Sequence, residues 1–234
     1  MPFACAHRGL SSETAENTLA SFGAAVAAGF PAVEMDLRTT ADGEVVVLHD
    51  AGIERTTDGT GRVDSMTWRE LQDYPTPDGP VPRLADLFTA LRAWDGLWNL
   101  EVKDKSATVP TLDLVRTHGL TARAMVTSME RKVLLEARDH APEVARGAIP
   151  FGPVDDDDLS AAADAACAWV NVDHDFLDEG EMARLRQAGF KVGSWTVNDL
   201  DRAQELAALG VACVITDRRE VGAGLKGAPP NAWA

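Results

Sequence analysis

Two histidines and three carboxylates stand at or near the ends of short β-rich runs. His7 and His49 each end such a run, Glu34 and Asp36 share a third, and Glu101 lies in a fourth. Charged side chains are rare inside strands, so this placement indicates a chemical role. Taken singly, either histidine would more often be a hydrogen-bonded structural residue. Together, beside three carboxylates, the two suit a general acid and a general base.

The carboxylates form a candidate site for a hard metal ion. Glu34 and Asp36 are two residues apart, so both side chains leave the same face of a strand. Without a cation, their charges would repel and one group would tend to take up a proton. With Glu101, they offer the oxygen ligands that Mg²⁺ and Ca²⁺ prefer. The alternative is a set of ion pairs with the basic residues Arg8, Arg38 and Lys103.

The overall charge limits the classes of partner. The 234 residues include 22 Lys and Arg against 37 Asp and Glu, a net charge of −15. Polyanions repel such a chain, so we expect neither nucleic-acid binding nor stable association with a membrane. An anionic substrate would need local positive charge, which Arg8 and Lys103 can supply at strand ends. Trp195, at another strand end, is either core filler or a flat wall for a substrate.

These residues need a scaffold that brings strand ends together. Strands are expected at 3–6, 32–37, 97–102, 122–127, 147–151, 169–172, 191–196 and 212–216. Helices are expected at 18–28, 84–93, 109–118, 131–140, 159–166, 179–187 and 199–209. This alternation indicates parallel βαβ units. We predict a single-domain (β/α)8 TIM barrel over 1–234, with the site at the C-terminal ends of the strands; a doubly wound sheet is the alternative.

A ninth β-rich run, at 45–49, does not belong to the barrel. Only a short Asp-Gly turn separates it from the preceding strand, whereas a parallel crossover needs a dozen or more residues. We therefore expect an antiparallel hairpin in which Thr40 lies opposite Glu44. Continued along the hairpin, this register places His49 opposite Met35, beside the carboxylate pair.

Three segments lie outside the regular pattern. Residues 51–82 are irregular, with one short helical piece at 67–71, and we expect a small cap over one barrel mouth. Residues 218–234 are rich in Gly, Ala and Pro, and we expect a peripheral tail. The acidic run 155–158 is better explained as a solvated helix N-terminus than as a metal site.

Cysteine content and apolar patterning bear on the compartment. The three cysteines show no paired spacing, which indicates neither a disulfide framework nor a zinc site. The first residues show no secretory signal, and no apolar stretch approaches the roughly 20 residues of a membrane span. We therefore expect a cytoplasmic protein.

The motifs, taken in order, resemble those of the glycerophosphodiester phosphodiesterase family. The resemblance covers about 6–217, nearly the whole chain. Each motif is weak alone, but the set in this order and spacing is highly specific. The matching pieces are Ala-His7-Arg8-Gly9, Glu16-Asn17-Thr18, Glu34-Met-Asp36, Thr40-Ala-Asp42-Gly43, His49-Asp50, Arg55-Thr56-Thr57 with Gly59 and Gly61, Glu101-Val-Lys103, Trp195-Thr-Val-Asn198 and Thr216-Asp217.

The resemblance implies a metal-dependent barrel that cleaves glycerol-linked phosphodiesters to sn-glycerol 3-phosphate and an alcohol. On the family pattern, Glu34, Asp36 and Glu101 match the ligands of one divalent metal ion. We expect Mg²⁺ or Ca²⁺, with Mn²⁺ as a third candidate. His7 and His49 match the acid–base pair.

The resemblance also implies the residues that hold the substrate. Arg8 and Lys103 match the cations on the phosphate, and Trp195 matches the aromatic residue that packs on the glycerol. Two departures are visible: Ala15 replaces the usual Pro before Glu-Asn-Thr, and the segment 127–130, Thr-Ser-Met-Glu, replaces the commoner Ser-Ser-Phe-Asp. Neither removes a chemical group named above, and the second alters the pocket wall.

We therefore predict a phosphoric diester hydrolase whose partner is a small glycerophosphodiester. Two alternatives are a phospholipase C- or D-like phosphodiesterase on a related barrel and a non-catalytic phosphate-binding barrel. A binding module has no need of two strand-end histidines, which argues against the last. Two routes remain open for the reaction: direct attack by water, or attack by the neighbouring glycerol hydroxyl through a cyclic phosphate.

Overall fold

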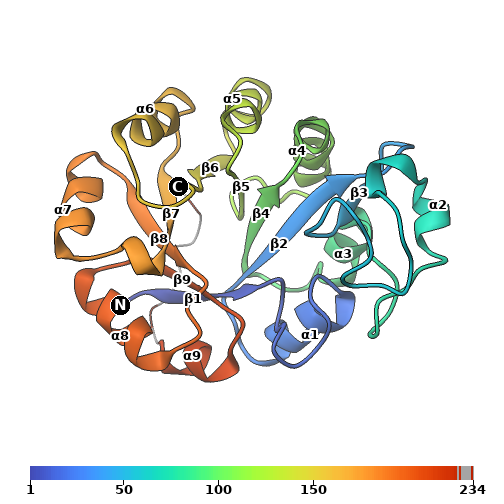
Figure 1. Ribbon diagram of the computed structural model, residues 1–234, viewed down its shortest axis with the longest axis horizontal. Helices are drawn as coiled ribbons and strands as arrows, with labels where there is room; N and C mark the ends of the chain where they lie inside the picture. Colours follow the sequence, from blue (N-terminus) through green and yellow to red (C-terminus); the bar gives the residue numbers. More distant parts are fainter. Residues whose placement is uncertain (226, 228–232, 234) are drawn as a thin grey trace.

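Residues 1–225, 227 and 233 of the chain are described by a computed structural model. Within them, eight parallel strands close into a barrel ringed by helices, with one further strand beside it (Figure 1). The strands are β1 (Phe3–His7), β2 (Ala32–Thr39), β3 (Val45–Val47), β4 (Leu97–Val102), β5 (Ala124–Ser128), β6 (Ala145–Ala148), β7 (Trp169–Asp173), β8 (Lys191–Trp195) and β9 (Cys213–Thr216). Because β1 pairs with both β2 and β9, the sheet closes on itself. The predicted TIM barrel is confirmed and the doubly wound sheet is excluded.

The helices follow the predicted stretches closely. They are α1 (Leu19–Ala27), α2 (Trp68–Leu71), α3 (Leu84–Ala90), α4 (Thr108–Thr117), α5 (Arg131–His140), α6 (Asp156–Asp164), α7 (Glu179–Gln187), α8 (Leu200–Leu209) and α9 (Arg219–Gly224). The acidic run begins α6, three residues before the expected start, because the Asp155 side chain caps the helix by accepting from Asp158 N. It is a helix N-terminus, as predicted.

One strand lies earlier than expected. Residues 147–151 are predicted as a strand, but β6 spans Ala145–Ala148. Pro150 has no N–H to contribute to a sheet, and Gly152 has a positive φ of 83°, so the chain leaves the barrel here. The loop that follows carries Phe151 outward.

The hairpin between β2 and β3 has the predicted register. The first three residues of β2 pair with β1, and its last three pair with β3. The strand β3 therefore occupies the edge of β2 beyond the end of β1. Thr40 N donates to Glu44 O at 3.0 Å, and Leu37 lies opposite Val47. The strand ends two residues before the predicted run does, but the same register still carries His49 to the level of Met35.

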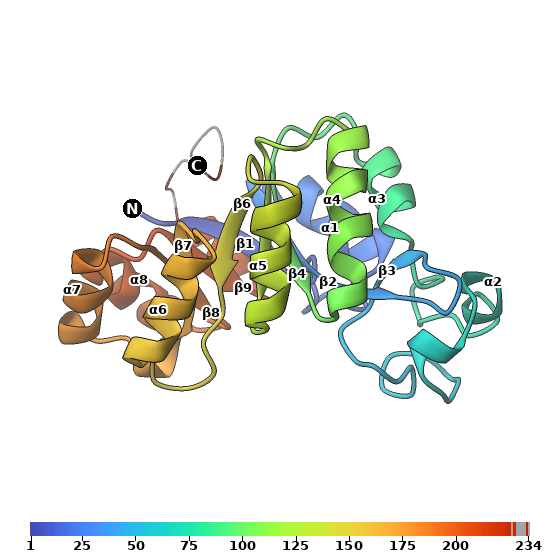
Figure 2. The same cartoon turned by 90° about the horizontal axis from the view of Figure 1, so that it is seen from above.

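Residues 51–82, called here the 51–82 loop, follow the hairpin and stand beside the barrel with α2 at their far side (Figure 2). Leu71 of α2 packs into a separate apolar cluster with five other buried residues, namely Val46, Leu48, Ile53, Val63 and Val81. Met66, Trp68 and Tyr74 pack against this cluster. The apolar side chains of the loop are therefore used largely to hold the loop together.

The C-terminal segment differs from the expected peripheral tail. Its first residues form α9, in which Val221 is buried. Trp233 is also buried: Trp169 Nε1 donates to Trp233 O at 2.9 Å, and Trp233 Nε1 donates to Trp98 O at 3.1 Å. The described part of 218–234 thus packs on the barrel, while 226, 228–232 and 234 lie outside the described residues. In the described part of the chain, no helix has the length and apolar character to cross a membrane.

Candidate active site

The barrel interior changes from apolar to polar along β1 and β2. In β1, Phe3 and Cys5 belong to an apolar cluster, and His7 follows on the same side. In β2, Ala32 belongs to that cluster, and the next inward residue is Glu34. Alternation with a period of two therefore carries the reactive side chains to the C-terminal ends of the strands. Seven of the eight predicted site residues line one pocket there, namely His7, Arg8, Glu34, His49, Glu101, Lys103 and Trp195.

The three carboxylates are brought together as expected. Glu34, Asp36 and Glu101 each offer an oxygen within 4.8 Å of the others. Glu34 Oε2 accepts from Arg8 N at 3.0 Å, but Glu34 Oε1 is buried and has no hydrogen-bond partner among the described residues. Burial, followed by the charge of Asp36, raises the pKa of Glu34 to about 8. A buried carboxylate oxygen without a partner, beside two further carboxylates, fits a divalent metal ion.

Asp36 is the eighth predicted residue and lies fully buried behind the pocket. Its Oδ1 lies 2.9 Å from Lys103 Nζ, and its Oδ2 lies 3.1 Å from Arg8 Nε. Asn17 Nδ2 also donates to Oδ2, at 2.8 Å. Burial alone would raise the pKa of Asp36, but the charges of Lys103 and Arg8 bring it down to about 2.

Ion pairing alone does not account for the cluster. Lys103 pairs with Glu101 as well as with Asp36, whereas Arg38 binds Asp104 and the His49 carbonyl instead. The basic residues therefore neutralise two of the three carboxylates and leave Glu34 without a cation on Oε1.

His7 is held by a carboxylate from the neighbouring strand. Its Nδ1 donates to Asp217 Oδ1 at 2.8 Å. Asp217 also accepts from Ser11 Oγ at 2.7 Å and from Asn198 Nδ2 at 2.6 Å. Burial alone would lower the pKa of His7, but the hydrogen bond with Asp217 and the charge of Glu34 raise it overall. The other ring nitrogen, Nε2, lies 3.9 Å from Glu34 Oε2, on the side of the metal-ligand candidates.

His49 is held in the same way by a different set of residues. Its Nδ1 donates to Asp50 Oδ1 at 2.6 Å, and Asp50 Oδ2 accepts from Arg55 Nε. Arg55 Nη1 and Nη2 also donate to the two carboxylate oxygens of Glu16, at 2.8 and 2.7 Å. Because Nδ1 of each histidine is occupied by a carboxylate, Nε2 is the nitrogen left for chemistry in both.

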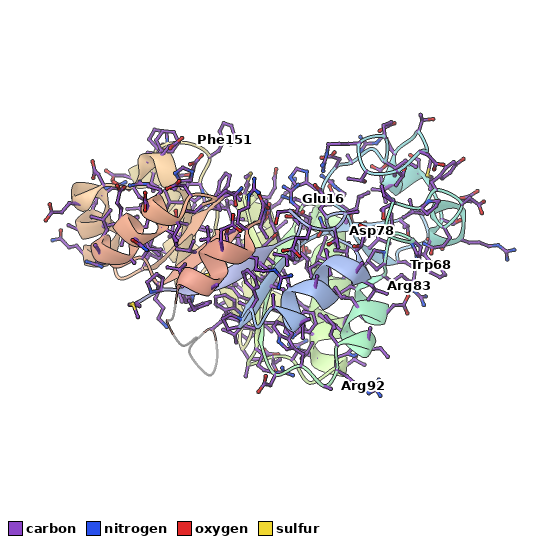
Figure 3. All side chains as sticks on the ribbon, turned by 90° about the horizontal axis from the view of Figure 1, so that it is seen from below. Glu16, Trp68, Asp78, Arg83, Arg92 and Phe151 are labelled. Carbon is purple, nitrogen blue, oxygen red and sulfur yellow. The ribbon has the colours of Figure 1, made fainter. Side chains whose placement is uncertain are left out.

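Glu16 connects this arrangement back to the barrel. Its Oε1 accepts from Arg8 Nη1 at 2.9 Å as well as from Arg55. In Figure 3, Glu16 lies between Phe151 on one side and Asp78 and Trp68 of the 51–82 loop on the other. A continuous chain of contacts therefore crosses the mouth: ion pairs join Arg8, Glu16, Arg55 and Asp50, and a hydrogen bond joins Asp50 to His49.

The opposite side of the pocket is mostly neutral. Trp195, Met129, Ile149 and Asn171 line it, and Trp195 Nε1 donates to Asn171 O at 3.0 Å. Among these residues, only Trp195 was predicted to belong to the site. Asn171 could have been found by its period-two spacing from Trp169, since both side chains then face the barrel interior.

The fold and the pocket together define a class of protein: a β/α barrel whose pocket combines acidic residues, basic residues and two histidines, a set suited to an anionic substrate. The chain belongs to the glycerophosphoryl diester phosphodiesterase family, whose model matches residues 7–221. It is therefore a phosphoric diester hydrolase, and the resemblance found from the motifs is confirmed.

Relatives and solved structures support this family over almost the whole chain. The glycerophosphodiester phosphodiesterase of Caldanaerobacter subterraneus subsp. tengcongensis is 27% identical, with 92% of this chain and 93% of that protein covered. An Oleispira antarctica phosphodiesterase, solved in complex with the product sn-glycerol-3-phosphate, is 25% identical with a TM-score of 0.90, covering 97% of this chain and 98% of that one. The glycerophosphodiester phosphodiesterase of Agrobacterium tumefaciens is 25% identical with a TM-score of 0.82, covering 96% and 100%.

Proposed function

We propose that this protein hydrolyses small glycerophosphodiesters to sn-glycerol 3-phosphate and an alcohol, with one divalent metal ion and two histidines. The single observation that carries the proposal is the composition of the pocket. Three carboxylates, one with a buried oxygen that has no hydrogen-bond partner among the described residues, cluster beside two histidines whose Nδ1 atoms are both occupied. This arrangement combines the parts that phosphodiester hydrolysis requires.

Glu34, Asp36 and Glu101 would hold the metal ion, which we expect to be Mg²⁺, Ca²⁺ or Mn²⁺. When bound, the ion supplies positive charge that stabilises the phosphate oxygens and favours ionisation of the attacking hydroxyl. Arg8 and Lys103 stand beside the carboxylates and would bind the remaining phosphate oxygens. Among the described residues, Arg8 Nη2 has no partner, since Nη1 is engaged with Glu16 and Nε faces Asp36.

His7 and His49 would move the protons. Each presents Nε2 because a carboxylate accepts from its Nδ1. One histidine accepts the proton of the attacking hydroxyl, and the other donates a proton to the departing alkoxide. Asp217 and Asp50 stabilise the protonated form of each ring and hold its orientation.

The glycerol part of the substrate would lie on the neutral side of the pocket, against Trp195. The Oleispira antarctica structure with sn-glycerol-3-phosphate supports this class of substrate. An intact phospholipid in a bilayer is less suitable, because the apolar residues of the 51–82 loop pack into their own cluster instead of forming a docking rim. A net charge of −15 also disfavours anionic lipid surfaces.

The test is a panel of glycerophosphodiesters assayed with several divalent metals, before and after chelation. We expect turnover of glycerophosphocholine or glycerophosphoethanolamine that is lost on chelation and restored by one or more metals. The matching phospholipids in vesicles serve as the comparison. A clear preference for the vesicle substrates would contradict the proposal and favour a phospholipase-like activity, and binding without turnover would favour the non-catalytic alternative.

A further inference from the structure

The Asn171 side chain in the pocket carries a buried hydrogen-bond donor that has no partner among the described residues. Asn171 lies in β7, and its side chain is buried, with 2% of the residue exposed. Its Nδ2 makes no hydrogen bond to any described residue. Buried amide groups are nearly always hydrogen-bonded, because an unpaired donor loses its contacts with water without compensation. A buried donor of this kind, in the lining of a pocket, is placed to bind an acceptor on a ligand.

The backbone around Asn171 is arranged to present its amide. β7 and β8 pair so that Asn171 lies opposite Gly193. A Cβ atom at position 193 would lie 2.2 Å from Asn171 Oδ1, so glycine there leaves the space that the amide occupies. The indole of Trp195 is tied to the same strand by its hydrogen bond to Asn171 O. The amide and the indole therefore form one wall.

The chemistry of this wall differs from that of the opposite one. The cations and carboxylates come from β1, β2 and β4, whereas Asn171 comes from β7, among neutral residues. The other asparagine in the pocket, Asn99 of β4, is already engaged, since its Oδ1 accepts from Thr127 Oγ1 at 2.8 Å. A neutral amide both donates and accepts, which matches a hydroxyl group better than a phosphate oxygen, which only accepts.

We infer that Asn171 is a specificity-determining residue that binds the terminal hydroxyl of the glycerol moiety on the Trp195 wall. The inference rests on the proposed function, which places the phosphate near Glu34, Arg8 and Lys103. From there the glycerol extends toward β7 and β8. Its C1 hydroxyl is farthest from the phosphate and reaches the amide, while the C2 hydroxyl stays next to the phosphate.

The test compares sn-glycero-3-phosphocholine with its analogue in which a hydrogen replaces the C1 hydroxyl. We expect the wild type to favour the hydroxylated substrate by about 10- to 100-fold in kcat/KM, because the analogue leaves a buried amide unpaired. Asn171→Ala should lower kcat/KM for the hydroxylated substrate by a similar factor and leave the analogue within about threefold of its wild-type value. Asn99→Ala is the matched control. It should keep the wild-type ratio between the two substrates, because its side-chain oxygen is already paired with Thr127 and it comes from β4 instead of the Trp195 wall.

A second measurement does not depend on turnover. The affinities of sn-glycerol 3-phosphate and its 1-deoxy analogue are measured by calorimetry in the wild type and in Asn171→Ala, where the same loss of discrimination is expected. Equal use of both substrates by the wild type, or an equal loss on both in Asn171→Ala, would overturn the inference. If the wild type hydrolyses neither substrate, the proposed function fails, and the calorimetric comparison then decides the role of Asn171 by itself.

Discussion

The two histidines reach one pocket from regions that are built differently. His7 ends β1, and its partner Asp217 follows β9, so the pairing of these two neighbouring strands sets both positions. His49 follows the hairpin, and its partner is the adjacent residue Asp50, which Arg55 of the 51–82 loop holds in place. One histidine is therefore supported by the closed barrel and the other by a loop with a small core of its own.

The difference extends to solvent exposure. The His7 side chain is 17% exposed and that of His49 is 34% exposed, while the Arg55 side chain is 47% exposed. Ion pairs near water contribute little individually and are screened by salt. The barrel-supported histidine is therefore the more enclosed of the two, and we expect the support of the loop-supported one to be easier to change without disturbing the fold.

The largest effect should come from the carboxylate cluster, because in the proposed function both histidines act on a substrate held there. We expect chelation to abolish activity, and Glu34→Gln, Asp36→Asn and Glu101→Gln each to weaken metal binding and lower kcat/KM by more than about 10³-fold. Metal titration by calorimetry alongside kinetics measures both. Full activity after exhaustive chelation would contradict this prediction.

The next effect should come from the histidines themselves. We expect His7→Ala and His49→Ala each to lower kcat by roughly 10²–10⁴-fold. The double variant should lose less than the product of the two losses, because both groups act in one reaction. The pH–rate profile should be bell-shaped in the wild type and lose one limb in each variant. Near-wild-type kcat in either variant would remove that histidine from the proposed mechanism.

The next effect concerns Asp217 and Asp50, the carboxylates that accept from Nδ1 of His7 and His49. We expect Asp217→Asn to lower kcat by about 10- to 100-fold, with a smaller loss for Asp50→Asn in its more exposed setting. The sign of the pH effect follows from His7. Burial lowers its pKa and Asp217 raises it, so removing the charge of Asp217 should shift the limb that reports His7 to lower pH.

The control is to combine Asp217→Asn and Asp50→Asn with each of the two histidine variants, His7→Ala and His49→Ala. In the His7→Ala background, Asp217→Asn should have little further effect on kcat, whereas Asp50→Asn should still lower it. The reverse should hold in the His49→Ala background. Equal losses in both backgrounds would mean that the carboxylates stabilise the fold instead of positioning one histidine each.

A smaller effect is expected in the pH dependence of metal affinity. Because burial and Asp36 raise the pKa of Glu34 to about 8, we expect Glu34 to bind a proton near neutral pH before a metal binds. The metal must displace that proton, so its affinity should rise about tenfold per pH unit between about pH 6 and pH 8 and then level off. Calorimetry in buffers of different ionisation enthalpy should detect the released proton. Glu34→Gln should remove the slope, and a flat wild-type profile would contradict the assignment.

The sequence allows the barrel and most of the site to be predicted, because both depend on local periodicity. Alternation along β2 places Glu34 and Asp36 on one face, and the short Asp-Gly turn sets the register that brings in His49. The contact between His7 and Asp217 depends on barrel closure between residues 210 positions apart, which local patterns do not reveal. The burial of Trp233 was missed for the same reason, since its partners lie in distant strands.

Loop sequences have no such periodicity, so the sequence does not predict that Arg55 connects Asp50 to Glu16. Arg55 and Glu16 both belong to motifs of the family, but nothing in either motif indicates that the two side chains form hydrogen bonds with each other. Their contact depends on how the 51–82 loop folds beside α1 and β3, which is decided by its own apolar cluster.

The smallest loss of activity is expected at Arg55. This residue connects the regions that support the two histidines. Its guanidinium binds Asp50 behind His49 and shares Glu16 with Arg8. We expect Arg55→Ala to lower kcat by about 3- to 10-fold, since each partner keeps its other contacts and partly exposed ion pairs are weak.

Arg55→Lys should recover only part of this loss, because one ammonium cannot replace three directed donors on two carboxylates. Arg62→Ala is the matched control, since Arg62 belongs to the same loop but pairs only with Asp64, at 3.0 and 2.6 Å, among the described residues. It should leave kcat unchanged. If Arg55 acts through His49, the loss caused by Arg55→Ala should shrink in the His49→Ala background and persist in the His7→Ala background. An equal loss in Arg62→Ala would instead mean that the loop responds to any lost charge, and that His49 does not depend on Arg55 in particular.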